Sequence, residues 1–165
     1  MGNTTSFSDP SGDRLCTLLK SKKTLLIPGT FDALSALIAK QAGFEALYLS
    51  GFSVSGSMLA KPDIGLVTAS EMTERARQIV AAVGDTPLIA DGDNGYGSEH
   101  DVARLVNAFE QAGVQSIQLE DQVSPKRCGH MDKKQVVTLE EAVSKIGMAV
   151  RSRQSKEFLI MARTD

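Results

Sequence analysis

Two aspartates separated by one glycine end an apolar run in the middle of the chain. Asp91 and Asp93 follow residues 88–90 (Leu-Ile-Ala) and precede the glycine-rich residues 94–97. Side chains two residues apart in an extended chain point to the same side, so both carboxylates would face one ligand. Such a pair repels itself unless a cation or proton neutralises it. The segment predicts a site for Mg²⁺, or Mn²⁺, which prefer oxygen ligands. A turn is the alternative.

A third carboxylate ends the next apolar run, residues 114–119. Glu120 would stand beside Asp91 and Asp93 if the two runs were neighbouring parallel strands, because the carboxyl ends of such strands meet at one edge. On their own, Glu120 and Asp121 could be exposed loop acids. Beside the aspartate pair, Glu120 favours a metal site.

A cysteine among basic residues stands in the loop that follows this second acidic segment. Cys128 has Lys126 and Arg127 on one side and Gly129 and His130 on the other. Positive neighbours favour a thiolate, so the cysteine could donate or accept a proton, or attack as a nucleophile. The long loop could close as a lid. A zinc site is disfavoured, since one Cys with one nearby His lacks the ligand count. A solvated basic loop is the alternative.

Two further segments could bind a carboxylate substrate. Arg163 follows the apolar residues 157–161, and its guanidinium could hold a carboxylate through two hydrogen bonds or form a structural ion pair. Ser50, Gly51 and Phe52 could offer backbone N–H groups and a hydroxyl.

The elements that must position these groups alternate along the chain. Apolar runs predict strands at residues 24–28, 46–50, 87–90, 114–119 and 157–161, and helical spacing predicts helices at 15–20, 31–41, 70–83, 101–111 and 138–151. Residues 53–66 read as irregular. Without hairpin signals, this alternation indicates an α/β fold with a parallel sheet flanked by helices. An open doubly wound sheet and a (β/α)₈ barrel both fit. The missing GxGxxG after the first strand, and the polar residues gathered after the strands, favour the barrel, with only its first five or so βα units in this chain.

Composition bounds the remaining possibilities. The 165 residues suffice for one domain, predicted at 14–165 after a flexible segment at 1–13. Eighteen Lys and Arg against 20 Asp and Glu disfavour a nucleic-acid partner, which wants clustered positive charge. No apolar run approaches the roughly 18 residues that a membrane span needs. Two cysteines and the absence of a signal-peptide pattern predict a reducing, cytoplasmic location.

Taken together, these segments resemble the isocitrate lyase/phosphoenolpyruvate mutase superfamily. The matches are residues 28–33 (Pro-Gly-Thr-Phe-Asp-Ala), 50–51 (Ser-Gly), 61–63 (Lys-Pro-Asp), 91–97 (Asp-Gly-Asp-Asn-Gly-Tyr-Gly), 119–122 (Leu-Glu-Asp-Gln), 126–130 (Lys-Arg-Cys-Gly-His) and 161–165 (Met-Ala-Arg-Thr-Asp). The cysteine loop is similar to that of the branch that cleaves C–C bonds, which includes isocitrate lyase, 2-methylisocitrate lyase, dimethylmalate lyase and oxaloacetate hydrolase. Residues 50–55, with Gly92 between the aspartates, look closer to petal-death-type lyases, which accept 2-alkylmalates and oxaloacetate.

The resemblance implies a role for each residue already singled out. Asp91 and Asp93 would hold Mg²⁺, directly or through water, with Glu120 and Asp63 supporting its water shell. The substrate would be bound by Ser50, Gly51, Phe52, Cys128, Gly129 and Arg163. Cys128 would act as general acid toward the carbanion released on bond cleavage, supported by Lys126, Arg127 and His130.

The resemblance also implies a (β/α)₈ barrel that assembles as a homotetramer. We expect a Mg²⁺-dependent lyase for a small 2-hydroxy or 2-oxo di- or tricarboxylate, of the 2-methylisocitrate or 2-alkylmalate type, with an enolate-like intermediate. The alternatives are an oxaloacetate hydrolase or decarboxylase, a phosphonopyruvate or carboxyphosphonoenolpyruvate enzyme, and an inactive half-barrel that serves binding or assembly. Because family members are considerably longer, we expect 165 residues alone to be poorly stable and little active.

Overall fold

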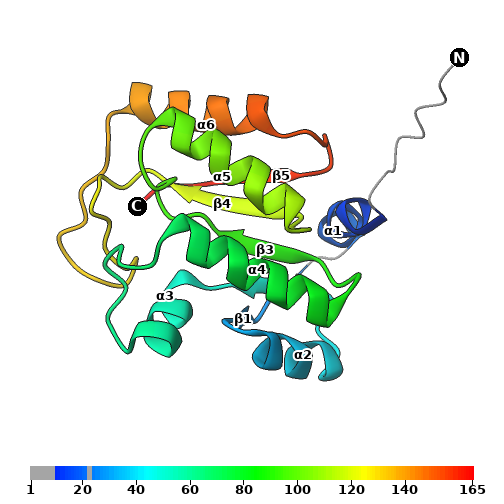
Figure 1. Ribbon diagram of the computed structural model, residues 1–165. Helices are drawn as coiled ribbons and strands as arrows, with labels where there is room; N and C mark the ends of the chain where they lie inside the picture. The colour runs from blue at the N-terminus through cyan, green and yellow to red at the C-terminus, as the bar shows by residue number, and fades with distance from the viewer. Residues whose placement is uncertain (1–9, 22–23) are drawn as a thin grey trace, which may run out of the picture.

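The chain folds as alternating strands and helices that form one parallel sheet (Figure 1). The computed structural model describes residues 10–21 and 24–165, so residues 1–9 of the predicted flexible segment lie outside the described residues. The helices are α1 Pro10–Ser21, α2 Ala33–Gln41, α3 Gly51–Val54, the π-helical η1 Ser55–Leu59, α4 Ala69–Val83, α5 Glu99–Gln111 and α6 Leu139–Ser152. The strands are β1 Gly29–Thr30, β2 Leu47–Leu49, β3 Leu88–Asp91, β4 Ser116–Glu120 and β5 Leu159–Arg163.

The strands lie in the order β1-β2-β3-β4-β5, and every neighbouring pair is parallel. Helix α2 packs against α4, α4 against α5, and α5 against α6. These four helices form one layer that covers one face of the sheet (Figure 1). A doubly wound sheet would reverse its strand order and carry helices on both faces. The sequential order confirms the predicted α/β fold built from the first five βα units of a barrel.

Two predicted strands shift along the sequence. The first falls on Gly29–Thr30 instead of 24–28, because the residues paired with β2 are these two, which follow the predicted segment. The fifth runs to Arg163 instead of ending at 161, since its pairing with β4 continues until Arg163 lies opposite Glu120.

Local capping contacts set where the helices begin. Glu71 accepts a hydrogen bond from the backbone N–H of Thr68, whose hydroxyl accepts one from Glu71 N, so α4 begins at Ala69, one residue before its predicted start. Asp101 binds Ser98 in the same way, and α5 therefore starts at Glu99, two residues before its predicted start. Helix α1 begins at Pro10, five residues early, so part of the predicted lead-in is helical.

The segment predicted as irregular contains a short helix. The Ser50 hydroxyl accepts a hydrogen bond from Ser53 N and caps α3, which continues into the π-helical turn η1. Ala60 then ends this turn with a left-handed backbone (φ 51°).

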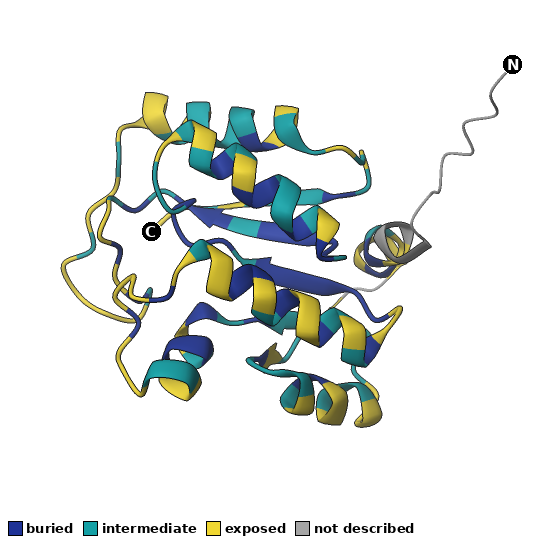
Figure 2. Ribbon diagram, in the orientation of Figure 1, coloured by how far each residue is buried: buried dark blue, intermediate teal, exposed yellow. Residues whose placement is uncertain are grey.

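Apolar side chains fill both faces of the sheet. The outer face packs on the helices through Met72, Ile79, Leu88, Phe109 and Ile117, all fully buried. The buried stripes of α4 and α5 face the strands in Figure 2, and their exposed stripes face outward. Among the described residues, no helix is long and apolar enough to cross a membrane.

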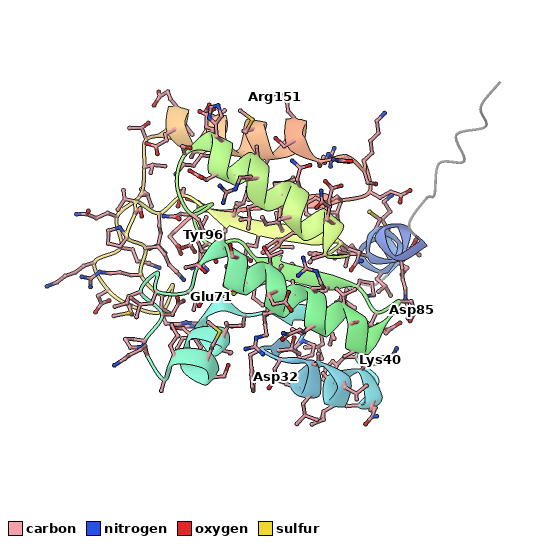
Figure 3. All side chains as sticks on the ribbon, in the orientation of Figure 1. Asp32, Lys40, Glu71, Asp85, Tyr96 and Arg151 are labelled. Carbon is pink, nitrogen blue, oxygen red and sulfur yellow. The ribbon has the colours of Figure 1, made fainter. Side chains whose placement is uncertain are left out.

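Helix α1 closes the amino-terminal end of the sheet. Leu15 and Leu18 pack against Ala46 and Ile89 on the inner face, in a cluster separate from the outer core. Asp85 lies at this end, near Lys40 (Figure 3). Its carboxylate forms an ion pair with Arg14, with 2.9 Å between Oδ2 and Nη1. The carboxyl ends of the strands are left open at the opposite side, where the predicted polar residues lie.

Candidate active site

A cavity of about 290 Å³ opens at the carboxyl ends of β2 to β5. Its lining consists of Tyr48 and ten of the predicted site residues: Ser50, Phe52, Asp63, Asp91, Glu120, Lys126, Cys128, Gly129, His130 and Arg163. Larger hollows of about 810 and 690 Å³ lie between α4 and α5 and beside α6, but neither contains the aspartates or the cysteine. The topology thus brings together groups from segments more than 100 residues apart.

The aspartate pair is held by its own backbone and by α3. Asp91 accepts hydrogen bonds from Gly51 N (3.1 Å) and Asp93 N (3.2 Å). Gly92 lies so close to β4 that a Cβ atom there would stand 2.7 Å from Ile117 and 2.8 Å from the Gln118 carbonyl oxygen. The glycine between the two aspartates is therefore required for the approach of β3 to β4.

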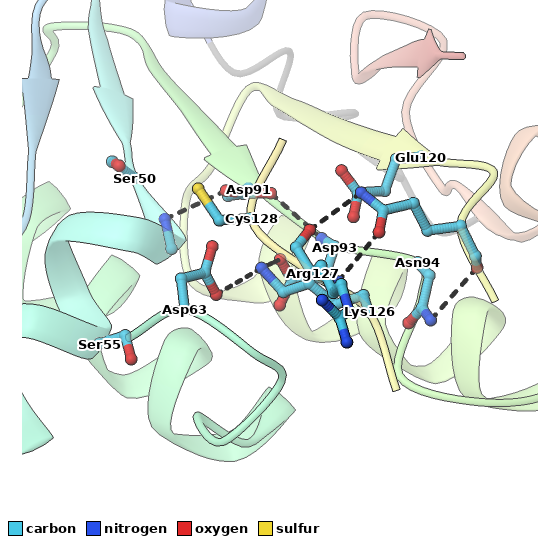
Figure 4. A network of polar contacts seen from close by, with 12 residues as sticks. Ser50, Ser55, Asp63, Asp91, Asp93, Asn94, Glu120, Lys126, Arg127 and Cys128 are labelled. Carbon is cyan, nitrogen blue, oxygen red and sulfur yellow. Dashed lines mark hydrogen bonds and ion pairs between the residues drawn. The ribbon is translucent and has the colours of Figure 1, made fainter. Parts of the chain in front are cut away.

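Lys126 stands among the carboxylates, which the sequence did not indicate (Figure 4). Its ammonium Nζ is 2.5 Å from Asp63 Oδ1 and 2.6 Å from Asp93 Oδ1, and its side chain is 5% exposed. Burial alone would lower the pKa of Lys126, but the charges and hydrogen bonds of Asp93 and Asp63 outweigh it and raise that pKa. Lys126 therefore stays charged and joins two of the predicted metal-site acids.

The remaining negative charge is only partly compensated. Burial raises the pKa of Asp91, and burial together with the charge of Asp91 raises the pKa of Asp93 to about 6. Burial likewise raises the pKa of Glu120 to about 7, although Arg163, with Nη1 at 3.3 Å from Glu120 Oε2, works against this. The second Glu120 oxygen, Oε1, is buried and finds no hydrogen-bond partner among the residues that the structure describes.

These acids fit Mg²⁺ by chemistry and charge. They offer oxygen ligands only, and the unpartnered Glu120 Oε1 is the kind of buried atom that a cation would satisfy. Across the part of the chain that the structure describes, however, no three Asp, Glu, His or Cys side chains already surround a single metal position. Lys126 pairs with both Asp63 and Asp93, and the ligand set stays a prediction.

Cys128 is buried, so the alternative of a solvated basic loop does not hold at this residue. Its Sγ atom lies 3.6 Å from His130 Nδ1, and its N–H donates to the Asp63 carbonyl oxygen at 2.9 Å. Only 6% of the residue is exposed, because the loop folds inward over the strand ends. Arg127, by contrast, is exposed and does not line the cavity.

Arg163 reaches the cavity beside the cysteine loop. Its Nη2 atom lies 2.5 Å from Asp165 Oδ1, and a Cβ atom on Gly129 would stand 2.0 Å from Nη2. Gly129 therefore leaves the space that the guanidinium occupies. The structure thus gathers Arg163, Gly129 and Cys128 at one wall of the cavity, with Phe52 at its mouth, 57% exposed.

The sequence model of the family described as phosphoenolpyruvate phosphomutase matches residues 15–165. The chain belongs to the phosphoenolpyruvate mutase/isocitrate lyase superfamily.

Several superfamily members are close to it in sequence. The chain is 49% identical to the 2,3-dimethylmalate lyase of Eubacterium barkeri over 90% of its own length and 51% of the relative. It is 43% identical to the 2-methylisocitrate lyase of Shewanella oneidensis (94% and 53%) and 40% identical to the petal death protein of Dianthus caryophyllus (99% and 52%). The chain spans about half the length of these relatives.

Solved structures of the superfamily share the fold. Oxaloacetate acetylhydrolase in complex with 3,3-difluorooxalacetate superimposes with a TM-score of 0.88 at 36% identity, over 94% of this chain and 54% of the other. Phosphonopyruvate hydrolase in complex with oxalate and Mg²⁺ superimposes with a TM-score of 0.84 at 34% identity, over 93% of this chain and 52% of the other. Mg²⁺ therefore occurs with a dicarboxylate in the superfamily.

Two residues of this superfamily site escaped sequence reasoning. Tyr48 lines the cavity from β2, and burial, followed by the charge of Asp91, raises its pKa well above the usual range. Its position two residues before Ser50, on the same side of an extended strand, could have indicated it. Gln122 was part of the 119–122 match but was assigned no role, yet its buried side chain hydrogen-bonds the cysteine loop at Arg127.

Proposed function

We propose that this chain carries the acidic and proton-donating part of a Mg²⁺-dependent carbon–carbon lyase. The observation that carries the proposal is the shared cavity, in which Cys128 meets a cluster of buried acids and Arg163. The substrate would be a small 2-hydroxy or 2-oxo carboxylate, whose charge and size suit a polar cavity of about 290 Å³. The homotetramer that the resemblance implies stays a prediction.

Substrate binding would fall to the groups at the strand ends. Arg163 offers a guanidinium that can hold a carboxylate through two hydrogen bonds. Tyr48, whose pKa is raised by burial, stays a neutral phenol and can donate to a substrate oxygen. Ser50 and Gly51 begin helix α3 beside Asp91, where a small ligand would meet main chain instead of bulky side chains.

The metal would be held by Asp91 and Asp93, with Glu120 and Asp63 around it. When bound, Mg²⁺ supplies positive charge that stabilises negative charge developing on substrate oxygen. The side chains arrange the site for this role: Asp91 is fixed by two backbone N–H groups, and Glu120 keeps one oxygen free of hydrogen bonds.

Cys128 would supply the proton. When the C–C bond of a 2-hydroxy acid breaks, the hydroxyl loses its proton to a base and becomes the carbonyl of one fragment. The electron pair of the broken bond stays on the carbon of the departing carboxylic acid, as an enolate-like species. The Cys128 thiol transfers its proton to this carbon and becomes a thiolate. His130, with Nδ1 at 3.6 Å from the sulfur, is placed to return a proton.

The relatives support this chemistry and also a second candidate. The 2,3-dimethylmalate and 2-methylisocitrate lyases favour cleavage of a substituted malate or isocitrate. The similarity to oxaloacetate acetylhydrolase, with its TM-score of 0.88, favours hydrolysis of oxaloacetate to acetate and oxalate. In both reactions a C–C bond is broken and the released carbon needs a proton, so the same cysteine would serve.

One assay distinguishes the candidates. The folded chain is incubated with 2,3-dimethylmalate, 2-methylisocitrate or oxaloacetate, each with Mg²⁺ and with EDTA. Because the chain spans about half the length of its relatives, we expect turnover of at least one substrate to be slow but dependent on Mg²⁺, with acetate and oxalate released only if the second candidate holds. Turnover that persists in EDTA, or in an Asp91→Asn variant, would count against the metal site. Absence of turnover of all three substrates by the folded chain with Mg²⁺ would overturn the proposal.

A further inference from the structure

We propose that Gln122 is a positioning residue that holds the loop with Lys126 and Cys128 over the site. The inference rests on the proposed function for its catalytic meaning, but its structural content is independent of any substrate. Gln122 follows β4 directly, is 1% exposed and does not line the cavity. It would act through the loop and not on the reacting atoms.

The carboxamide of Gln122 pairs with both main-chain groups of one loop residue. Its Oε1 accepts from Arg127 N at 2.9 Å, and its Nε2 donates to the Arg127 carbonyl oxygen at 3.0 Å. Arg127 is the residue between Lys126, which binds Asp63 and Asp93, and Cys128, which lines the cavity. Fixing the Arg127 backbone therefore also fixes the backbone positions from which the Lys126 and Cys128 side chains extend.

A third hydrogen bond joins the same carboxamide to the end of β5. Nε2 donates to Asp165 Oδ2 at 2.7 Å. Asp165 Oδ1 in turn lies 2.5 Å from Arg163 Nη2 and 3.2 Å from Lys134 Nζ, and these contacts lower the pKa of Asp165 despite its burial. Through Asp165, Gln122 thus links the cysteine loop to the Arg163 guanidinium in one hydrogen-bond network.

Only a glutamine side chain meets these three demands. Glutamate would keep an acceptor for Arg127 N but would lose the donors and set a second carboxylate against Asp165. An apolar side chain of similar size would leave the Arg127 N–H and C=O without these partly buried hydrogen bonds. The chain carries a matched case at the other end of β4: Gln115 is also buried, accepts from Leu88 N and donates to the Gly113 carbonyl oxygen, far from the cavity.

The test compares Gln122→Met with Gln115→Met in the 165-residue chain. The readout is the rate at which iodoacetamide alkylates Cys128, relative to Cys16, measured by peptide mass mapping. We expect a rise of about tenfold in Gln122→Met, since loss of the buried hydrogen bonds frees the loop, and little change in Gln115→Met. If the chain turns over a substrate, kcat falls more than KM rises in Gln122→Met.

Hydrogen exchange on the unaltered chain keeps the inference testable if Gln122→Met does not fold. The Arg127 amide should exchange more slowly than those of Asp132 and Lys133 in the same loop. An Arg127 amide that exchanges as fast as these, or a Cys128 alkylation rate that is unchanged or equally raised in both variants, overturns the inference. These readouts need no catalysis, so absence of turnover would refute the proposed function and leave this inference standing.

Discussion

The ammonium of Lys126 lies 2.6 Å from the Asp93 carboxylate, and both side chains are more than nine-tenths buried. The same ammonium binds Asp63, so a single lysine compensates two of the four acids at the strand ends. A buried charge that loses its partner is costly, because little solvent reaches it. This contact therefore ties the stability of the fold to the composition of the site.

Replacing Lys126 by methionine should leave Asp63 and Asp93 without their cation. We expect the free energy of unfolding to fall by about 3 kcal/mol at pH 7.5, measured by urea denaturation. Lys145→Met is the control. Lys145 pairs at 3.4 Å with Glu141, which is half-exposed and in the same helix, and its loss should cost less than about 0.5 kcal/mol. Equal losses in the two variants would show that the buried ion pairs do not matter.

The raised pKa of Glu120 predicts a dependence of stability on pH. Burial raises this pKa from 4.5 to about 7, so the folded chain binds more protons here than the unfolded chain. The contribution of Glu120 is therefore fully present below pH 4.5 and is lost as the pH rises through 7. Relative to Glu120→Gln, which does not titrate, the unaltered chain should lose on the order of 2 kcal/mol between pH 5 and pH 8. Parallel curves of unfolding free energy would contradict the shift.

Mg²⁺ should stabilise the folded chain, because the folded state gathers the acids and the unfolded chain does not. At a concentration a hundredfold above its Kd, the ion would add about 2.7 kcal/mol to the free energy of unfolding, visible as a higher Tm that EDTA reverses. Asp91→Asn should abolish this response, whereas Asp132→Asn, at an exposed loop position, should keep it. A Tm shift that survives in Asp91→Asn would place the ion elsewhere.

The order of elements and the location of the site followed from sequence because both depend on local signals. Alternating apolar runs and caps such as Thr68 specify the βα units, and parallel pairing then brings the strand ends to one edge. Asp91 and Glu120 were predictable in this way, as residues at strand ends, whereas Cys128 was indicated by its basic neighbours.

The contacts of Lys126 and the burial of Cys128 did not follow from sequence. Both depend on how residues 122–134 fold back over the sheet, which is set by tertiary hydrogen bonds such as that from Gln122 to Arg127. The π-helical turn after α3 escaped for the same reason, since Ser55 is fixed by hydrogen bonds to the Lys61 and Pro62 carbonyl oxygens. The periodicity of apolar residues, which predicts helices and strands, gives no information about such tertiary hydrogen bonds.

Cys128→Ser should separate proton transfer from folding. The hydroxyl is a much weaker acid than the thiol, so turnover should fall by roughly 10²–10⁴-fold, while the Tm and its response to Mg²⁺ stay close to those of the unaltered chain. Cys16→Ser, on α1 and remote from the cavity, is the control and should keep full turnover. A Cys128→Ser variant with undiminished turnover would remove the cysteine from the mechanism.

Gly129→Ala tests the contact between the cysteine loop and Arg163. The added methyl group would stand 2.0 Å from Arg163 Nη2, too close for either group to stay in place, so the guanidinium or the loop must move. We expect a loss of about 1–3 kcal/mol in unfolding free energy from this overpacking, together with weaker binding of oxalate in the presence of Mg²⁺, measured by calorimetry. Gly56→Ala is the matched control, because no atom of the described residues lies within 4 Å of a Cβ atom there and its helical backbone accepts alanine. If Gly129→Ala binds oxalate as the unaltered chain does, Arg163 does not hold the carboxylate, and the substrate must be oriented by the groups on β2 and α3 instead.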